Sequence, residues 1–354
     1  MRDLLKTIGF SIPVVQAPMA GTATPRLAAA VSNAGGLGSI GIGTSTVDQA
    51  RLAIREIRTL TDRPFHVNLF CDPPARPDAD RDAAWIDYLA PQFRAFDAEP
   101  PAALTDTSQS LLGNDDLVAM LLEERPPVIS FHFGLPDDSV LTRLRDAGSY
   151  LIGCATNLED GRAIAAAGLD AVIAQGIEAG GHRGLFDLDR PDERLGTFAL
   201  TRLLVRELDI PVIAAGGIMD GAGVAACLAL GAAAAQMGTA FIGCPESNAS
   251  DDYRRRLFSP AAETTRHTAA ISGRPARGMV GRFLRTVESG NAPTIPDYPL
   301  AYSAYSALTA AALATGNHEY GTCWAGQGAM MARQMPAAEL MATLQSEIAA
   351  ARPA

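Results

Sequence analysis

Charge and paired cysteines are scarce in this 354-residue chain, and each scarcity argues against a class of protein. Charged residues make up 19% of the sequence and the net charge is −10 at pH 7, so no basic stripe is available to neutralise the phosphates of a nucleic acid. The five cysteines are scattered without Cys-x-x-Cys spacing, which favours free thiols in a reducing cytoplasm over disulfides. Residues 1–7 do not have the pattern of a signal peptide, and no apolar run reaches membrane-spanning length, so neither a signal peptide nor a membrane span is expected.

Metal-binding and hydrolase motifs are missing as well. The histidines stand at positions 66, 132, 182, 267 and 318, far apart and in no short ligand pattern, so no metal site is predicted. The chain has no Gly-x-Ser-x-Gly nucleophile elbow. Cys154 lies inside an expected strand, where packing explains it better than a role as a nucleophile.

Short apolar segments alternate with amphipathic ones along most of the chain. Strands are expected at residues 12–18, 37–41, 65–70, 127–134, 150–156, 170–174, 211–217 and 232–237. Eight strands that alternate with helices predict an α/β fold, a closed (β/α)8 TIM barrel. A doubly wound open sheet is the alternative, although the first strand is not followed by a Gly-x-Gly-x-x-Gly turn. The helix at 45–60 is expected to begin with Ser45 and Asp48 at capping-box spacing.

Two stretches interrupt this alternation. Residues 71–125 hold a proline-rich connection and two helical pieces, which are expected to lie over one face of the barrel. Residues 246–320 are predicted to form a smaller, mostly helical inserted domain that caps the substrate site at the barrel mouth. The barrel itself is then expected to comprise residues 1–245 and to be completed by 321–354.

A glycine-rich loop that carries a histidine follows the sixth expected strand. Its sequence is Gln175-Gly-Ile-Glu-Ala-Gly-Gly-His-Arg-Gly184. Glycines let the backbone take unusual dihedral angles and approach a ligand closely, and His182 lies at the tip of the loop. The pattern indicates an active-site element, with a glycine-rich turn and a solvated histidine as the alternative.

Other polar and glycine residues stand at the carboxyl ends of the strands, where barrel enzymes place their chemistry. Asn68 and Gln175 carry amides that can both donate and accept, as the edge of a flavin or pyridine ring requires. The glycines after strands seven and eight lie where many barrels bind phosphate through backbone N–H groups. A structural role for Asn68 and a simple turn at Gly216-Gly217 remain alternatives. The strand ends comprise Met19, Ala20, Gly21, Asn68, His132, Gln175, Gly180, Gly181, His182, Gly216, Gly217, Gln236, Met237, Gly238 and Thr239.

Several motifs together resemble the nitronate monooxygenases, formerly called 2-nitropropane dioxygenases. They are Gln16-Ala-Pro-Met-Ala-Gly21, Asn33-Ala-Gly-Gly-Leu-Gly38, Val67-Asn68, Ser130-Phe-His-Phe-Gly-Leu-Pro136, the histidine loop, Ala215-Gly-Gly-Ile218, Gln236-Met-Gly-Thr239 and Trp324-Ala-Gly-Gln-Gly328. The resemblance implies a barrel that binds FMN through the strand ends, and a smaller domain that closes the site. It also implies that His182 is the catalytic histidine and His132 a second histidine of the site. Tyr298 and Tyr302, in the smaller domain, are expected to contact the substrate.

The reaction that the resemblance implies is oxidative denitrification of an alkyl nitronate, such as propionate 3-nitronate, with O₂. The products are an aldehyde or oxo acid and nitrite, and the expected assembly is a monomer or homodimer. A related flavin barrel that reduces quinones or enoyl-acyl carrier proteins with NAD(P)H is the first alternative. A barrel that binds a phosphate-bearing ligand without redox chemistry is the second. Anaerobic bleaching of the flavin by NADH or NADPH would favour the first, and a colourless protein that takes up no FMN would favour the second.

Overall fold

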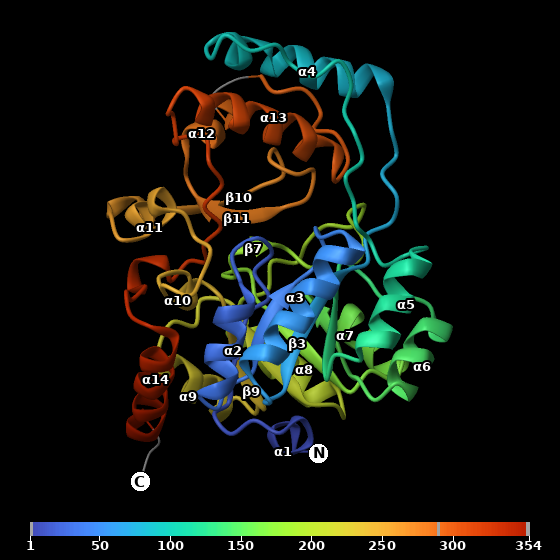
Figure 1. The fold of residues 1–354 in the computed structure, drawn as a ribbon, viewed down its shortest axis with the longest axis vertical. Coiled ribbons are helices and arrows are strands. Elements are labelled where there is room, and N and C mark those ends of the chain that lie inside the picture. The colour runs from blue at the N-terminus through green and yellow to red at the C-terminus, as the bar shows by residue number, and fades with distance from the viewer. Residues whose placement is uncertain (1–2, 289–290, 352–354) are drawn as a thin grey trace.

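Parallel strands form a closed barrel in the computed structural model, which describes residues 3–288 and 291–351 (Figure 1). Within these residues the hydrogen-bonded order is β2-β3-β4-β5-β6-β8-β9-β1, and a parallel bridge between Val15 and Leu37 joins β1 to β2. The predicted barrel is confirmed, and the open sheet is excluded. The barrel strands are β1 (Val14–Gln16), β2 (Gly38–Gly41), β3 (Phe65–Phe70), β4 (Val128–His132), β5 (Tyr150–Ala155), β6 (Ala171–Gln175), β8 (Val212–Ala215) and β9 (Ala234–Met237).

Helices cover the outside of the barrel because each turns an apolar face inward. In α3, for example, Ala50, Ile54 and Ile57 recur at helical spacing and are buried. The capping box of α3 is formed by Thr46 and Gln49, so the predicted pair of Ser45 and Asp48 is wrong by one residue. The helices outside the smaller domain are α1 (Leu4–Ile8), α2 (Pro25–Asn33), α3 (Val47–Leu60), α5 (Asp115–Glu124), α6 (Asp138–Asp146), α7 (Leu158–Ala166), α8 (Thr197–Glu207), α9 (Gly221–Ala229), α10 (Thr239–Ile242) and α14 (Ala337–Ala351).

Both sides of the barrel strands are buried, which explains their nearly continuous apolar sequences. All residues of β3 and β6 are buried, including the polar His66, Asn68 and Gln175. No helix in the described part of the chain is long and apolar enough to cross a membrane.

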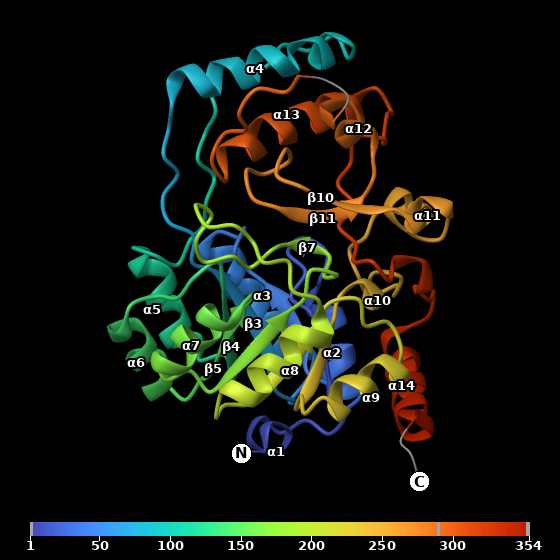
Figure 2. The same ribbon diagram turned by 180° about the vertical axis from the view of Figure 1, so that it is seen from behind.

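A second layer lies beyond the carboxyl ends of the barrel strands, and α4 forms its outer edge (Figures 1 and 2). Trp85, Leu89 and Phe93 of α4 are fully buried in one cluster with Leu308 and Tyr320. The expectation that this helical piece covers a barrel face is therefore wrong, because its apolar stripe packs on α12 and α13 instead. The elements of this layer are α4 (Ala79–Arg94), α11 (Asp251–Leu257), η1 (Pro260–Glu263), β10 (Thr265–Thr268), β11 (Ala276–Met279), α12 (Arg282–Glu288) and α13 (Leu300–Ala314), and η2 (Ala329–Met331) precedes α14.

A small antiparallel sheet joins the two layers and was not predicted. Its strands are β10, β11 and β7 (Gly181–His182), in the order β10-β11-β7. In this sheet His182 is paired with Ala276, and Gly181 is paired with Arg277. The histidine loop thus leaves the barrel and becomes an edge strand of the smaller layer. Pairing with β11 therefore holds the backbone of His182 on the side of the smaller layer.

Candidate active site

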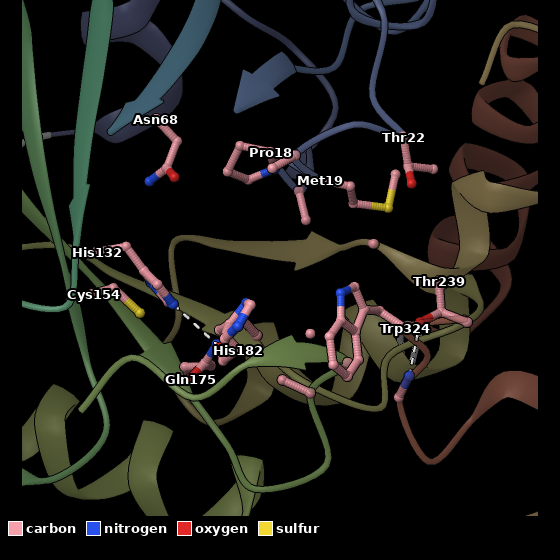
Figure 3. Close-up of a pocket in the computed structure, with 18 of the residues that line it drawn as sticks. Pro18, Met19, Thr22, Asn68, His132, Cys154, Gln175, His182, Thr239 and Trp324 are labelled. Atoms are coloured by element: carbon pink, nitrogen blue, oxygen red, sulfur yellow. Dashed lines mark hydrogen bonds between the residues drawn. The ribbon is translucent and has the colours of Figure 1, made fainter. Parts of the chain in front are cut away.

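A cavity of about 430 Å³ opens between the carboxyl ends of the barrel strands and the smaller layer (Figure 3). Its volume is in the range of small-molecule and cofactor sites. Every residue predicted for the site lines this one cavity: Met19, Ala20, Gly21, Asn68, His132, Gln175, Gly180, Gly181, His182, Gly216, Gly217, Gln236, Met237, Gly238, Thr239, Tyr298 and Tyr302. Several other residues that line the cavity could not be predicted from the sequence, among them Phe70, Thr107, Ser108, Met219 and Tyr253, and Trp324 stood out only as part of a motif.

Hydrogen bonds from two side chains fix the backbone of His182. Its carbonyl oxygen accepts from Gln175 Nε2 at 2.9 Å and from His132 Nε2 at 3.2 Å. Gln175 Oε1 in turn accepts from the N–H of Gly184 at 2.8 Å. Both ends of the Gln175 amide are therefore engaged by the histidine loop, and the contacts of Gln175 position His182.

The imidazole of His182 contacts the smaller layer. Its Nε2 lies 2.8 Å from Ser272 Oγ, and its ring is surrounded by aromatic rings, including those of Tyr298 and Trp324. Ser272 Oγ also lies 3.2 Å from the carbonyl oxygen of Arg274, to which the hydroxyl can only donate. A hydroxyl that donates there accepts from Nε2–H of His182. This arrangement leaves Nδ1 as the basic nitrogen.

Burial keeps both site histidines neutral. Desolvation, with smaller contributions from His132 and Arg274, lowers the pKa of His182 to about 3. Desolvation is also the main cause that lowers the pKa of His132 to about 4. At pH 7 both imidazoles are therefore neutral, and the basic nitrogen of His182 carries no proton.

Gly180 and Gly181, which precede His182, need to be glycine for different physical reasons. A Cβ on Gly180 would lie 2.5 Å from the backbone nitrogen of Gly326, so a side chain there would collide with the main chain. Gly181 has open space around it but a φ of 73°, in the left-handed region that glycine tolerates best. Gly217 also adopts a left-handed backbone conformation, with a φ of 70°.

Unpaired hydrogen-bonding groups gather on the barrel side of the cavity. In the part of the chain that the structure describes, the N–H groups of Gly217, Gly238 and Thr239 donate to no protein acceptor. Gln236 Oε1 is buried and has no hydrogen-bond partner among the described residues. Free N–H groups at these strand ends suit a phosphate, and an unpaired amide oxygen suits the N–H of a polar ring. Both features fit a flat ligand that carries a phosphate.

A buried cation lies close to the cavity on the side of the smaller layer. Arg274 is 2% exposed, and its guanidinium lies 4.2 Å from the ring centroid of Phe133 and 5.7 Å from that of Tyr298. One of its nitrogens donates to the carbonyl oxygen of Leu185 at 2.9 Å. The charge of Asp72 raises the pKa of Arg274 against the larger, lowering effect of desolvation. Both charges act on this side of the cavity: Arg274 lowers the pKa of His182, whereas Asp72 raises the pKa of Tyr298 more than Arg274 lowers it. No group of three metal-ligating side chains was found among the described residues.

Comparisons with known proteins agree over nearly the whole chain. A family model described as nitronate monooxygenase matches residues 2–347. A nitronate monooxygenase of Paraburkholderia phytofirmans is 54% identical over 347 residues, which cover 98% of this chain and 95% of that protein. One of Pseudomonas aeruginosa is 52% identical over 343 residues, or 97% and 98% of the two chains. The crystal structure of a nitroalkane oxidase from Streptomyces ansochromogenes matches with a TM-score of 0.90 and 42% identity, over 99% of both chains.

Proposed function

Since the chain belongs to the nitronate monooxygenase family, we propose that it converts alkyl nitronates and O₂ to nitrite and an aldehyde or oxo acid. The chain is an oxidoreductase of a flavin-dependent family. The observation that carries the finer proposal is the neutral, buried His182 on the wall of a cavity that also offers unpaired N–H groups for a phosphate.

We infer that the flavin is FMN. The N–H groups of Gly217, Gly238 and Thr239 would hold its phosphate, because they are unpaired at the strand ends where barrels bind phosphate. Asn68 and Gln236 would meet the polar edge of the ring. When bound, the flavin supplies the electron acceptor of the reaction and its reactivity with O₂.

His182 would act on the proton of a neutral nitroalkane. Its Nδ1 accepts the α-proton, and the nitronate that forms beside it stabilises the imidazolium, which burial alone disfavours. The positive charge of Arg274 then favours the anionic product of this step over its neutral precursor. A nitronate that is supplied as the anion needs no proton transfer, so His182 contributes only to its binding.

The test is to purify the protein, release its cofactor by denaturation and identify it by mass, then to assay propionate 3-nitronate with O₂. We expect one FMN per chain, with nitrite formed as nitronate and O₂ are consumed. Anaerobic NADH and NADPH should leave the flavin oxidised. Rapid flavin bleaching by either nucleotide without nitrite formation would support the reductase alternative, and a protein that takes up no flavin would refute the proposal.

A further inference from the structure

A chain of hydrogen-bonded polar side chains crosses the interior of the barrel and ends at the cavity. Ser39 Oγ lies 2.9 Å from His66 Nδ1, and His66 Nε2 lies 2.5 Å from Ser130 Oγ. Ser130 Oγ lies 2.7 Å from Asn68 Nδ2. Ser39, His66 and Ser130 are completely buried and Asn68, which lines the cavity, is 5% exposed.

Strand register brings these side chains together. Ser39 is paired with His66 across β2 and β3, and Asn68 is paired with Ser130 across β3 and β4. His66 and Asn68 are two residues apart on one strand and so point to the same side. The interior of a TIM barrel is ordinarily filled with branched apolar side chains, and burying unpaired polar groups there costs stability. Each of these four side chains has a hydrogen-bond partner, which offsets much of that cost.

The contacts of Asn68 identify the donor at the cavity end of this network. The amide nitrogen of Asn68 also lies 3.4 Å from the backbone carbonyl oxygen of Ser130, which can only accept, so the amino group faces Ser130. Ser130 Oγ accepts from Asn68 and has one proton of its own, for which His66 Nε2 at 2.5 Å is an available acceptor. Burial lowers the pKa of His66 to about 3, so the imidazole is neutral and has one proton, and if Ser130 donates to Nε2 that proton is on Nδ1, toward Ser39.

We propose that Ser130 and His66 are positioning residues that hold the Asn68 amide with its carbonyl oxygen toward the cavity. In this orientation Asn68 accepts a hydrogen bond from a donor on the bound ring. An Asn68 released from Ser130 could turn over and present its amino group instead. The consequence for ligand binding rests on the proposed flavin site, whereas the direction of hydrogen-bond donation can be tested without any ligand.

The first experiment measures the tautomer of His66 in the flavin-free protein. Because the chain has five histidines, ¹⁵N-histidine labelling gives a small set of NMR signals, and the signal that disappears in His66→Gln identifies His66. We expect a neutral ring with the proton on Nδ1. A proton on Nε2, or a charged ring at pH 7, would overturn the proposed direction of donation.

The second experiment is a double-mutant cycle of Ser130→Ala and Asn68→Leu, read out as the Kd of the flavin-free protein for FMN and as the flavin midpoint potential. Each single variant should weaken FMN by about 2- to 12-fold, the range of one net hydrogen bond. The double variant should be little weaker than Asn68→Leu alone, because Ser130 acts through Asn68.

Ser149→Ala is the matched control, since it also removes a buried hydroxyl, one that donates to Pro126 at the amino-terminal end of β5. It should leave the Kd for FMN unchanged. If Ser130→Ala does not fold, Ser130→Cys replaces it with a side chain of similar size that hydrogen-bonds weakly. Additive losses of FMN affinity in the double variant, or an unchanged Kd and potential in Ser130→Ala, would show that Ser130 has only a structural role. Failure of the wild-type protein to bind FMN would refute the proposed function instead.

Discussion

Replacing His182 by asparagine separates the two tasks of this residue. Asparagine keeps a polar side chain but has no basic nitrogen. The backbone of position 182 should stay in place, because Gln175 and His132 bind its carbonyl oxygen and the strand pairing with Ala276 is made by the main chain. His182→Asn should therefore fold and bind FMN as the wild type does.

The expected losses differ between a neutral nitroalkane and its nitronate. Loss of a general base typically lowers the rate by ~100- to 10,000-fold, which should apply to kcat/KM for the neutral substrate. The nitronate has already lost its proton, so the loss is at most that of a hydrogen bond to a charged group. That bond is worth roughly 1.5–3 kcal/mol, or about 13- to 160-fold. In one preparation, the loss for the neutral substrate should clearly exceed the loss for the nitronate.

The assay is nitrite release and O₂ consumption with both forms of one nitroalkane. His267→Asn is the control, because His267 hydrogen-bonds the Ile177 carbonyl oxygen at 3.2 Å beside the same loop but does not line the cavity. It should lose little activity with either substrate. Equal losses of His182→Asn with both substrates would refute the role of a base. In the wild type, kcat/KM for the neutral substrate should also show no acid limb near pH 6.5, since the pKa of His182 in the free protein is about 3.

Three further predictions concern the cofactor, the substrate and stability. Gly217→Val should yield largely flavin-free protein by absorbance, because its φ of 70° strains a branched residue and its Cβ would lie 3.1 Å from Glu178 Cβ. For an assumed separation of ~10 Å and an effective dielectric of ~20, a unit charge contributes about 1.7 kcal/mol, so Arg274→Met should raise KM for the nitronate by roughly 15-fold, while Arg274→Lys should not. Burial holds the pKa values of His66 and His132 at about 3 and about 4, below their ordinary 6.5. Below pH 6.5 the unfolded chain therefore binds more protons than the folded protein. The free energy of unfolding, measured by chemical denaturation, should be highest above pH 6.5 and fall toward pH 4, by up to ~1.4 kcal/mol per pH unit for each histidine. A Tm and unfolding free energy that stay constant over this range would contradict the neutral, buried state of both rings.

The barrel could be predicted because its strands follow local rules. Phe65–Phe70 was predicted with its observed bounds, since an apolar run that is buried on both faces differs plainly from the polar segments around it. The cavity residues could be found for a related reason. The carboxyl ends of parallel strands meet at one end of a barrel, so a correct strand list places Asn68, His132 and Gly217 in the same region without knowledge of any contact.

Long-range pairing could not be predicted in this way. The strand β7 has two residues, and its partner β11 lies more than 90 positions along the chain, so neither segment carries a strand pattern of its own. The apolar stripe of α4 is visible in the sequence, but the face that it covers depends on where α12 and α13 fold. The contact of Ser272 with His182 carried no signal in the sequence, because the same hydroxyl also bonds the backbone of Arg274 within its own turn.

Gln175 shows how a residue placed correctly in the cavity can have partners that the sequence does not reveal. The sequence predicts an amide at the end of the sixth strand that meets the cofactor ring, and Gln175 does line the cavity. Its nitrogen donates to the carbonyl of His182, however, and its oxygen accepts from Gly184, so the loop engages both ends. The path of that loop is set by the left-handed Gly181 and by pairing with β11, which strand periodicity does not encode. Gln236, whose oxygen has no partner among the described residues, is therefore the better candidate for the contact with the ring.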